Sequence, residues 1–112
     1  MTAEALRQRI DRFRKMVEGM PDNHVARFGL ANACFDAGLL EDAEAEYRHC
    51  LRLQPEWMAV AICLGRCLVM RGGTEEARRV LTAARELALR QGHSSPLEEI
   101  AELEERCDQG HR

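Results

Sequence analysis

The sequence repeats itself with a period of thirty-four residues. When residues 21–54 are laid over residues 55–88, apolar positions fall on apolar positions and small residues on small residues. The identical pairs are Pro21 with Pro55, Leu30 with Leu64, Gly38 with Gly72, Glu41 with Glu75, Ala43 with Ala77 and Leu53 with Leu87. Periods of about 20 to 50 residues are typical of solenoids, in which each unit buries its apolar face against the next. The period therefore predicts stacked repeats.

The first period is predicted to fold as two helices. Residues 24–37 carry apolar or small side chains at the three-and-four spacing of an amphipathic helix. Asp22 or Asn23 can cap the start of this helix, and Gly38 can end it in the left-handed conformation. A second helix is expected over residues 41–53, because acidic residues in its first turn suit the positive end of the helix dipole.

The second period and the two ends extend this plan to six helices and no strand. Residues 57–71 form the next helix, and another is expected to start at Thr74, as its cap, and to run to about Gln91. An N-terminal helix is indicated by an apolar stripe of Leu6, Ile10, Phe13 and Val17. The last helix, which begins with a Ser95–Glu98 capping box, is expected to bury Leu97, Ile100, Ala101 and Leu103.

Small residues explain how two helices of a pair come close together. Ala31 and Gly65 lie midway along the first helix of each pair, and Ala43 and Ala77 lie near the start of the second. Small side chains there let the backbones approach, while larger neighbours fill the surrounding space. The composition agrees, because the chain has only three Phe, one Tyr and one Trp, whereas sheets favour β-branched and aromatic residues.

The overall charge and the cysteine content favour a cytoplasmic protein. A net charge of -3 creates no long-range field that would draw the chain to nucleic acid or anionic lipid. We find no apolar run of membrane-spanning length and no secretory signal in the first twenty residues. Five cysteines, an odd number without framework spacing, suit a reducing compartment. We therefore expect no membrane and no nucleic-acid partner.

These features resemble the tetratricopeptide repeat (TPR) family. The resemblance is carried by the period, the paired Leu and Ala or Gly, the turn Gly, the following Ala and the closing Pro. It implies a single all-α domain over residues 1–112, an α-α superhelix (TPR-like solenoid) of six antiparallel helices. The implied parts are a half-repeat helix at 4–21, two repeats at 22–55 and 56–89, and a capping helix at 93–108. Arg27 and Ala61 stand where the family often has Trp.

The resemblance also implies a function, namely a non-catalytic module or scaffold that binds a peptide or helix of a partner protein. In such repeats the first helix of each pair lines a concave groove. The residues placed there are Val25, Phe28, Asn32, Phe35, Ala59, Ile62, Arg66 and Val69. Arg66 is the best candidate for holding a carboxylate or a backbone carbonyl, and Asn32 can offer both a donor and an acceptor. No cofactor is implied.

Two departures argue against one known mode of binding in the family. Some members clamp the acidic C-terminal tails of chaperones with Lys and Asn residues. Here Phe28 stands where the clamp needs Lys, and Cys63 stands where the second repeat should supply Asn. We therefore do not expect chaperone-tail binding, and the groove residues suit a helix or an extended apolar segment equally.

The two phenylalanines of the first repeat have two possible roles. Phe28 and Phe35 are either partner contacts or core residues, covered by the N-terminal helix or by a second copy of the chain. The alternative function is accordingly a self-assembling homodimer or oligomer, in which the groove is covered by its own copy.

The remaining cysteines, histidines and charged residues do not indicate a further site. Cys63 and Cys67 are four residues apart but lack the further ligands that zinc needs. The four histidines, His24, His49, His93 and His111, are scattered and do not form a catalytic set. The basic N-terminal helix is interleaved with acidic residues, which indicates a solvated surface.

Overall fold

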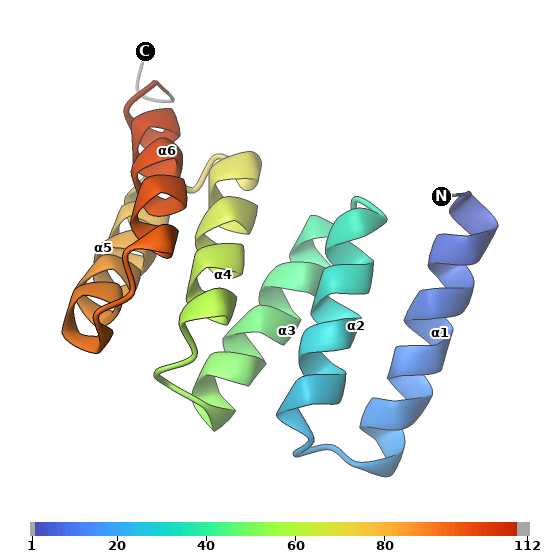
Figure 1. Cartoon of the computed structure of the whole chain (residues 1–112). Helices are drawn as coiled ribbons and strands as arrows, with labels where there is room; N and C mark the ends of the chain where they lie inside the picture. The colour runs from blue at the N-terminus through green and yellow to red at the C-terminus, as the bar shows by residue number, and fades with distance from the viewer. Residues whose placement is uncertain (1, 110–112) are drawn as a thin grey trace. The chain divides into compact units, whose positions relative to one another are not determined.

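The computed structural model describes residues 2–109, and this part of the chain folds into six α-helices without a strand (Figure 1). The helices are α1 (Ala3–Gly19), α2 (His24–Asp36), α3 (Leu40–Leu53), α4 (Met58–Arg71), α5 (Thr74–Gln91) and α6 (Ser95–Gln109). They form two compact units that divide between Pro55 and Glu56, with three helices in each. The predicted all-α fold of six helices is confirmed. Among the described residues, no helix is long and apolar enough to cross a membrane.

The helix ends follow local sequence signals, with one exception. The Oδ1 atom of Asn23 accepts a hydrogen bond from the Ala26 amide at 3.1 Å, so Asn23 rather than Asp22 caps α2. Gly38 and Gly72 both lie in the left-handed region, with φ of 79° and 84°, a conformation that side chains with a Cβ rarely adopt. The prediction that Thr74 caps α5 is wrong, because Gly73 holds the cap position. The predicted end of α5 at Gln91 is confirmed.

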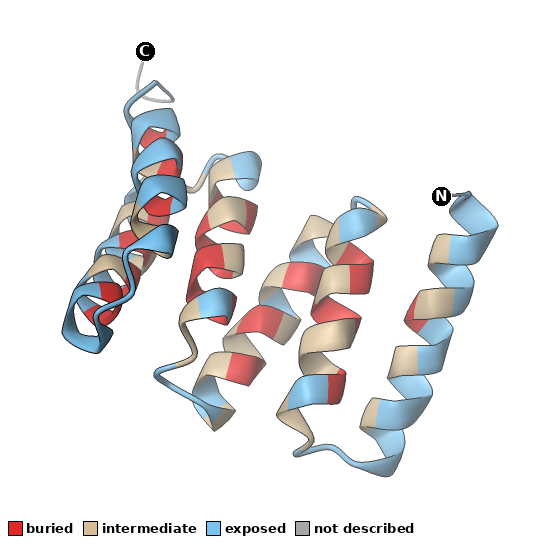
Figure 2. Ribbon diagram, in the orientation of Figure 1, coloured by how far each residue is buried: buried red, intermediate tan, exposed pale blue. Residues whose placement is uncertain are grey.

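In the first unit, α2 packs against both α1 and α3 (Figure 1). The largest side chain in this core is Tyr47 of α3, which has no exposed surface. Gly29 allows α1 to approach α2, because a Cβ at this position would lie 2.3 Å from Cε1 of the Phe13 ring. Both α2 and α3 carry buried residues among exposed and half-buried ones (Figure 2).

In the second unit, α5 packs against α4 and α6. Gly65 brings α4 and α5 together, because a Cβ there would lie 2.6 Å from Cδ2 of the buried Leu81. The core of α6 differs in part from the prediction. Its buried residues are Ile100, Leu103 and Cys107, whereas Leu97 is half-buried and Ala101 is exposed. The face of α6 that meets α4 and α5 thus runs through positions 100, 103 and 107.

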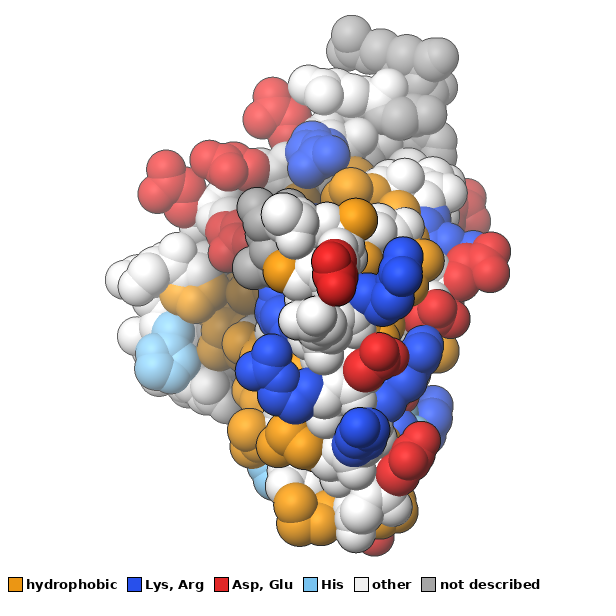
Figure 3. Space-filling model, turned by 90° about the vertical axis from the view of Figure 1, so that its right-hand side faces the viewer, with side chains coloured by type: hydrophobic (Ala, Val, Ile, Leu, Met, Phe, Trp, Pro, Cys, Tyr) orange, Lys and Arg blue, Asp and Glu red, His pale blue; other side chains and the backbone are white. Residues whose placement is uncertain are grey.

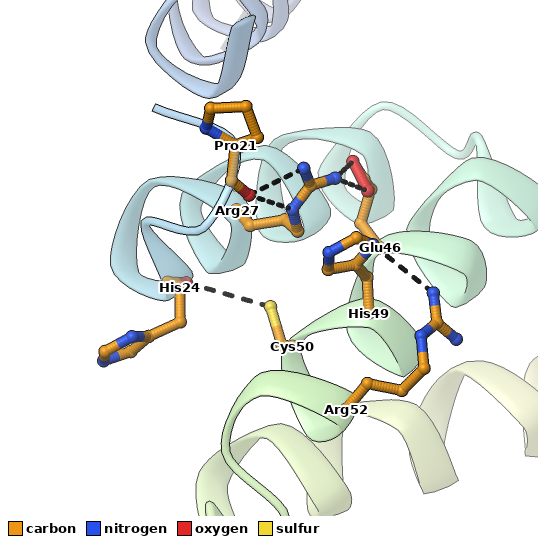
Figure 4. Close-up of polar contacts among 7 residues, drawn as sticks. All are labelled: Pro21, His24, Arg27, Glu46, His49, Cys50 and Arg52. Atoms are coloured by element: carbon orange, nitrogen blue, oxygen red, sulfur yellow. Dashed lines mark hydrogen bonds and ion pairs between the residues drawn. The ribbon is translucent and has the colours of Figure 1, made fainter. Parts of the chain in front are cut away.

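An arginine replaces the tryptophan that the resemblance would place at position 27. The Arg27 guanidinium donates to Glu46 Oε1 at 2.9 Å and, through Nε and Nη2, to the Pro21 carbonyl at 3.3 and 2.9 Å (Figure 4). Only 12 % of the Arg27 side chain and 18 % of the Glu46 side chain are exposed. Arg27 therefore joins α2 to Glu46 of α3 and to the turn before α2 that contains Pro21.

The outer surface of α1 carries charges of both signs. Lys and Arg side chains are interspersed with Asp and Glu in the view onto this side of the molecule (Figure 3). The exposed basic residues of α1 are Arg7, Arg12, Arg14 and Lys15, and the exposed acidic ones are Glu4, Asp11 and Glu18. Such mixed, exposed charge is typical of a solvated helix face.

Candidate functional site

An open groove lies in the second unit, between α4 and the start of α6. Its volume is about 640 Å³. It is lined by Met58, Ala59, Ile62, Cys63 and Arg66 of α4, by His93 of the preceding turn, and by Ser95, Pro96 and Glu99 of α6. Three of the predicted site residues, Ala59, Ile62 and Arg66, thus meet in one groove. Val69, which was also predicted, is half-buried and does not line it.

The groove has an apolar floor, which follows from the helical spacing of α4. Met58 and Ile62 are four residues apart and so lie on one face of the helix. Ile62 is largely buried, Met58 and Pro96 are half-buried, and Ala59 is exposed. A floor of this kind can hold an apolar side chain of a ligand, because burying such a side chain removes its surface from water.

Two charged side chains stand in the groove. Nη1 of Arg66 lies 3.8 Å from Oε1 of Glu99, and Nη2 of Arg66 donates to Sγ of Cys63 at 3.6 Å. The Arg66 side chain is 37 % exposed and the Glu99 side chain is 50 % exposed, so both are accessible to water. The groove therefore combines an apolar floor with one guanidinium and one carboxylate.

The sequence did not indicate Glu99 as a groove residue. The repeat could not have found it, because one period before Glu99 stands Gly65, which is buried. The helix α6 does not follow the register of the two repeats. Nor did the sequence indicate the other groove residues Met58, His93 and Pro96. The nearest sequence feature was the turn before the Ser95–Glu98 capping box.

The predicted site residues of the first unit lie along α2. Val25 is 64 % exposed, while Phe28, Asn32 and Phe35 are half-buried. The Tyr47 hydroxyl donates to Oδ1 of Asn32 at 2.6 Å, and the Tyr47 and Phe28 rings lie 6.2 Å apart at 57°. The Asn32 carbonyl oxygen is therefore already engaged by the core, and the amide N–H groups are the part of this side chain best placed to meet a ligand.

Burial makes three of the cysteines, Cys34, Cys50 and Cys107, poor nucleophiles. Burial raises the pKa of Cys50 to about 11, an effect that the nearby Glu46 carboxylate increases and the Arg27 guanidinium opposes. Burial is also the main cause that raises the pKa of Cys34 and of Cys107. Reactivity requires the thiolate, so these thiols are structural.

No metal-binding cluster is found in the described part of the chain. Across residues 2–109, no group of three or more His, Cys, Asp or Glu side chains could hold a metal ion. Cys67 is buried and Cys63 is half-buried in the groove wall. His24, His49 and His93 lie on α2, α3 and the turn before α6, and His111 lies outside the described residues.

Comparison with known proteins shows which fold this is. No protein-family model matches the sequence, and no curated protein matches it. Among solved structures, the chain is similar to the TPR2B domain of yeast Sti1 in its complex with pHsp70, at 18 % sequence identity. The alignment covers 96 % of each chain, and the TM-score is 0.83. The chain has the fold of a tetratricopeptide-repeat domain. The likeness concerns the TPR fold, and the partner named for the yeast domain remains a property of that domain.

Proposed function

We propose that the chain is a non-catalytic protein-interaction module that holds a segment of a partner protein in the groove between α4 and α6. The observation that carries this proposal is the combination of an apolar floor at Ile62 and a guanidinium at Arg66 in one groove of about 640 Å³. Ligand sites commonly combine apolar walls with a few convergent polar groups. The TPR fold supports the proposal, because such domains are known as protein-interaction modules.

Each part of the groove has a role in this proposal. Apolar side chains of the partner rest on Met58 and Ile62, and a fully buried aliphatic side chain contributes about 1.5 to 3 kcal/mol. Arg66 donates hydrogen bonds to an oxygen of the partner. The exposed face of α2 is a second candidate contact surface, with Val25 and Phe28 as apolar contacts and Asn32 as a hydrogen-bond donor. Phe35 is proposed to contribute half-buried apolar surface on α2, and Val69 is proposed to do so separately on α4, three residues after Arg66.

The chemistry of the partner differs from that of an acidic chaperone tail. The yeast neighbour is named in complex with pHsp70. In this chain Phe28 and Cys63 replace the Lys and Asn of the clamp that the family uses for acidic tails, so we propose a protein partner of another kind. A net charge of -3 supports neither nucleic acid nor a membrane surface as the partner. We place the module in the cytoplasm, where free thiols persist.

A pair of matched variants tests the proposal. Ala59 lines the groove and Ala83 lies on α5, and both are exposed, so an arginine at either position is compatible with folding. Affinity capture from a lysate should retain the same protein bands with wild type and Ala83→Arg and lose them with Ala59→Arg. Circular dichroism of both variants checks that helicity is unchanged. Equal capture by both variants would contradict the groove as the binding site.

Light scattering tests the alternative function, in which the chain self-assembles and a second copy covers the groove. A purified chain that is monomeric at all concentrations removes the homodimer or oligomer. A dimer that Ala59→Arg dissociates, while Ala83→Arg does not, would instead make a second copy of the chain the occupant of the groove.

A further inference from the structure

We propose that Arg66 and Glu99 together read the uncharged main chain of an extended segment, and that Glu99 excludes acidic segments. This inference rests on the proposed function, namely that the groove binds part of a partner protein. It goes further because it assigns the chemistry of the bound segment and gives a specificity role to Glu99.

The geometry of the two side chains supports the binding of a main chain. Arg66 projects from α4 and Glu99 from α6, and both line the groove. Their nearest charged atoms are 3.8 Å apart, which is longer than the roughly 2.7–2.9 Å of a charge-assisted hydrogen bond. Because both side chains are partly exposed, a ligand can reach the donor and the acceptor from the groove.

A donor beside an acceptor complements an extended main chain. In an extended strand the N–H and C=O groups of one residue point to the same side of the chain, as they do in a paired antiparallel ladder. The Arg66 guanidinium can donate to this C=O group, and a Glu99 carboxylate oxygen can accept from this N–H group. Arg66 and Glu99 cannot bind the main chain of a helix in this way, because its N–H and C=O groups are hydrogen-bonded within the helix. An apolar side chain of the same segment then rests on Ile62.

The charges of Arg66 and Glu99 support the exclusion of acidic segments. Arg66 and Glu99 balance each other, so the two side chains together suit an uncharged ligand. A carboxylate that approached the Arg66 guanidinium would also come within a few ångströms of the Glu99 carboxylate, and like charges at such distances in a partly enclosed groove repel. Glu99 therefore weakens the binding of any segment that carries an acidic residue at this point.

Two blocked peptides that differ in one residue test both parts of this inference. The probes are the N-acetylated, C-amidated pentapeptides Ala-Leu-Ala-Leu-Ala and Ala-Leu-Glu-Leu-Ala, titrated into the full ¹⁵N-labelled chain. We expect the neutral peptide to shift the amide signals of Ile62, Arg66 and Glu99. The glutamate peptide should bind at least fivefold more weakly. Nuclear Overhauser contacts within the bound neutral peptide should show an extended chain.

Two variants isolate the role of Glu99. Glu99→Gln removes the carboxylate charge and leaves the Arg66 charge unopposed, so the glutamate peptide should then bind at least as tightly as the neutral peptide. Glu102→Gln makes the same charge change at an exposed position of α6 outside the groove lining, and it should leave the discrimination unchanged. A discrimination that both variants abolish equally would show a general effect of charge and overturn the role of Glu99.

The remaining outcomes separate this inference from the proposed function. Equal or tighter binding of the glutamate peptide to wild type overturns the exclusion of acidic segments, while the groove still binds peptide. A helical bound peptide overturns main-chain reading and leaves the groove as the site. If neither peptide shifts the α4 and α6 signals, or if these signals shift only with protein concentration, the inference is overturned. The capture experiment with Ala59→Arg then decides the proposed function independently.

Discussion

The packing of the second unit depends on the absence of a Cβ at Gly65. A Cβ at this position would lie 2.6 Å from Cδ2 and 2.8 Å from Cγ of Leu81. Leu81 has no exposed surface, so it cannot swing into solvent. Because the contact includes Cγ as well as a terminal methyl, the whole Leu81 side chain must move if residue 65 becomes alanine.

The expected cost of Gly65→Ala follows from two opposing terms. Alanine stabilises the interior of a helix by about 0.5 to 1 kcal/mol relative to glycine. Forcing an extra methyl group into a well-packed core costs about 1 to 3 kcal/mol. A displaced Cγ corresponds to the upper part of that range, so we expect a net loss of about 1 to 2 kcal/mol in the free energy of unfolding.

Urea denaturation, followed by circular dichroism and by the fluorescence of Trp57, measures this loss against two matched glycines. Gly19→Ala adds a Cβ with no atom within 4 Å and should not destabilise the chain. The atoms nearest to a Cβ at Gly29 belong to the ring of the half-buried Phe13, which can turn away, so Gly29→Ala should cost less than Gly65→Ala.

A thermodynamic cycle with Leu81→Ala identifies the cause. Once Leu81 is truncated, Gly65→Ala should no longer destabilise the chain and should show the small gain of its helix propensity. An unchanged stability of Gly65→Ala, or the same loss in both backgrounds, would refute the idea that close backbone approach at this position holds the second unit together.

Three further perturbations test contacts of the first unit. Glu46→Ala leaves the mostly buried Arg27 without this carboxylate and should lower the free energy of unfolding, measured by urea denaturation, by about 2 to 3 kcal/mol. A loss below about 0.5 kcal/mol would contradict a structural role for the pair. Tyr47→Phe removes the hydroxyl that donates to Asn32 and should lower the free energy of unfolding by about 1 kcal/mol with unchanged helicity, whereas an unchanged stability would contradict that contact. Burial raises the pKa of Cys50 from 9.0 to about 11, so the thiol ionises at a lower pH in the unfolded chain than in the folded chain. Its contribution to the free energy of unfolding should therefore be fully present below pH 9 and be lost between pH 9 and pH 11. Cys50→Ala should reduce this loss in pH-dependent denaturation, and an identical pH profile in the variant would contradict the assignment.

The parts of the fold that depend on local signals and on the repeat could be predicted from the sequence. The helix ends at Gly38 and Gly72 follow from residues that favour one backbone conformation. Gly65 was identified as a point of close approach because it aligns with Ala31 one period earlier, and both are buried. Period and residue size were sufficient for these inferences because each concerns a single position of the backbone.

The pairing of side chains between helices could not be predicted in the same way. Arg27 departs from the pattern of the resembling family, and its ion pair with Glu46 depends on how α2 and α3 cross. The bond from Tyr47 to Asn32 likewise changes which atoms Asn32 can offer to a ligand. Glu99 was missed because α6 leaves the repeat register, so the sequence provided no position from which to place it opposite Arg66.

Site-specific photo-crosslinking tests the central claim, that the groove between α4 and α6 is the surface that binds a partner protein. The photoreactive residue benzoylphenylalanine would replace Ala59 in the groove or Ala83 on α5, both of which are exposed alanines. We predict a crosslinked partner band from position 59 and none from position 83. A band from position 83 alone, or bands of equal strength from both positions, would contradict the claim.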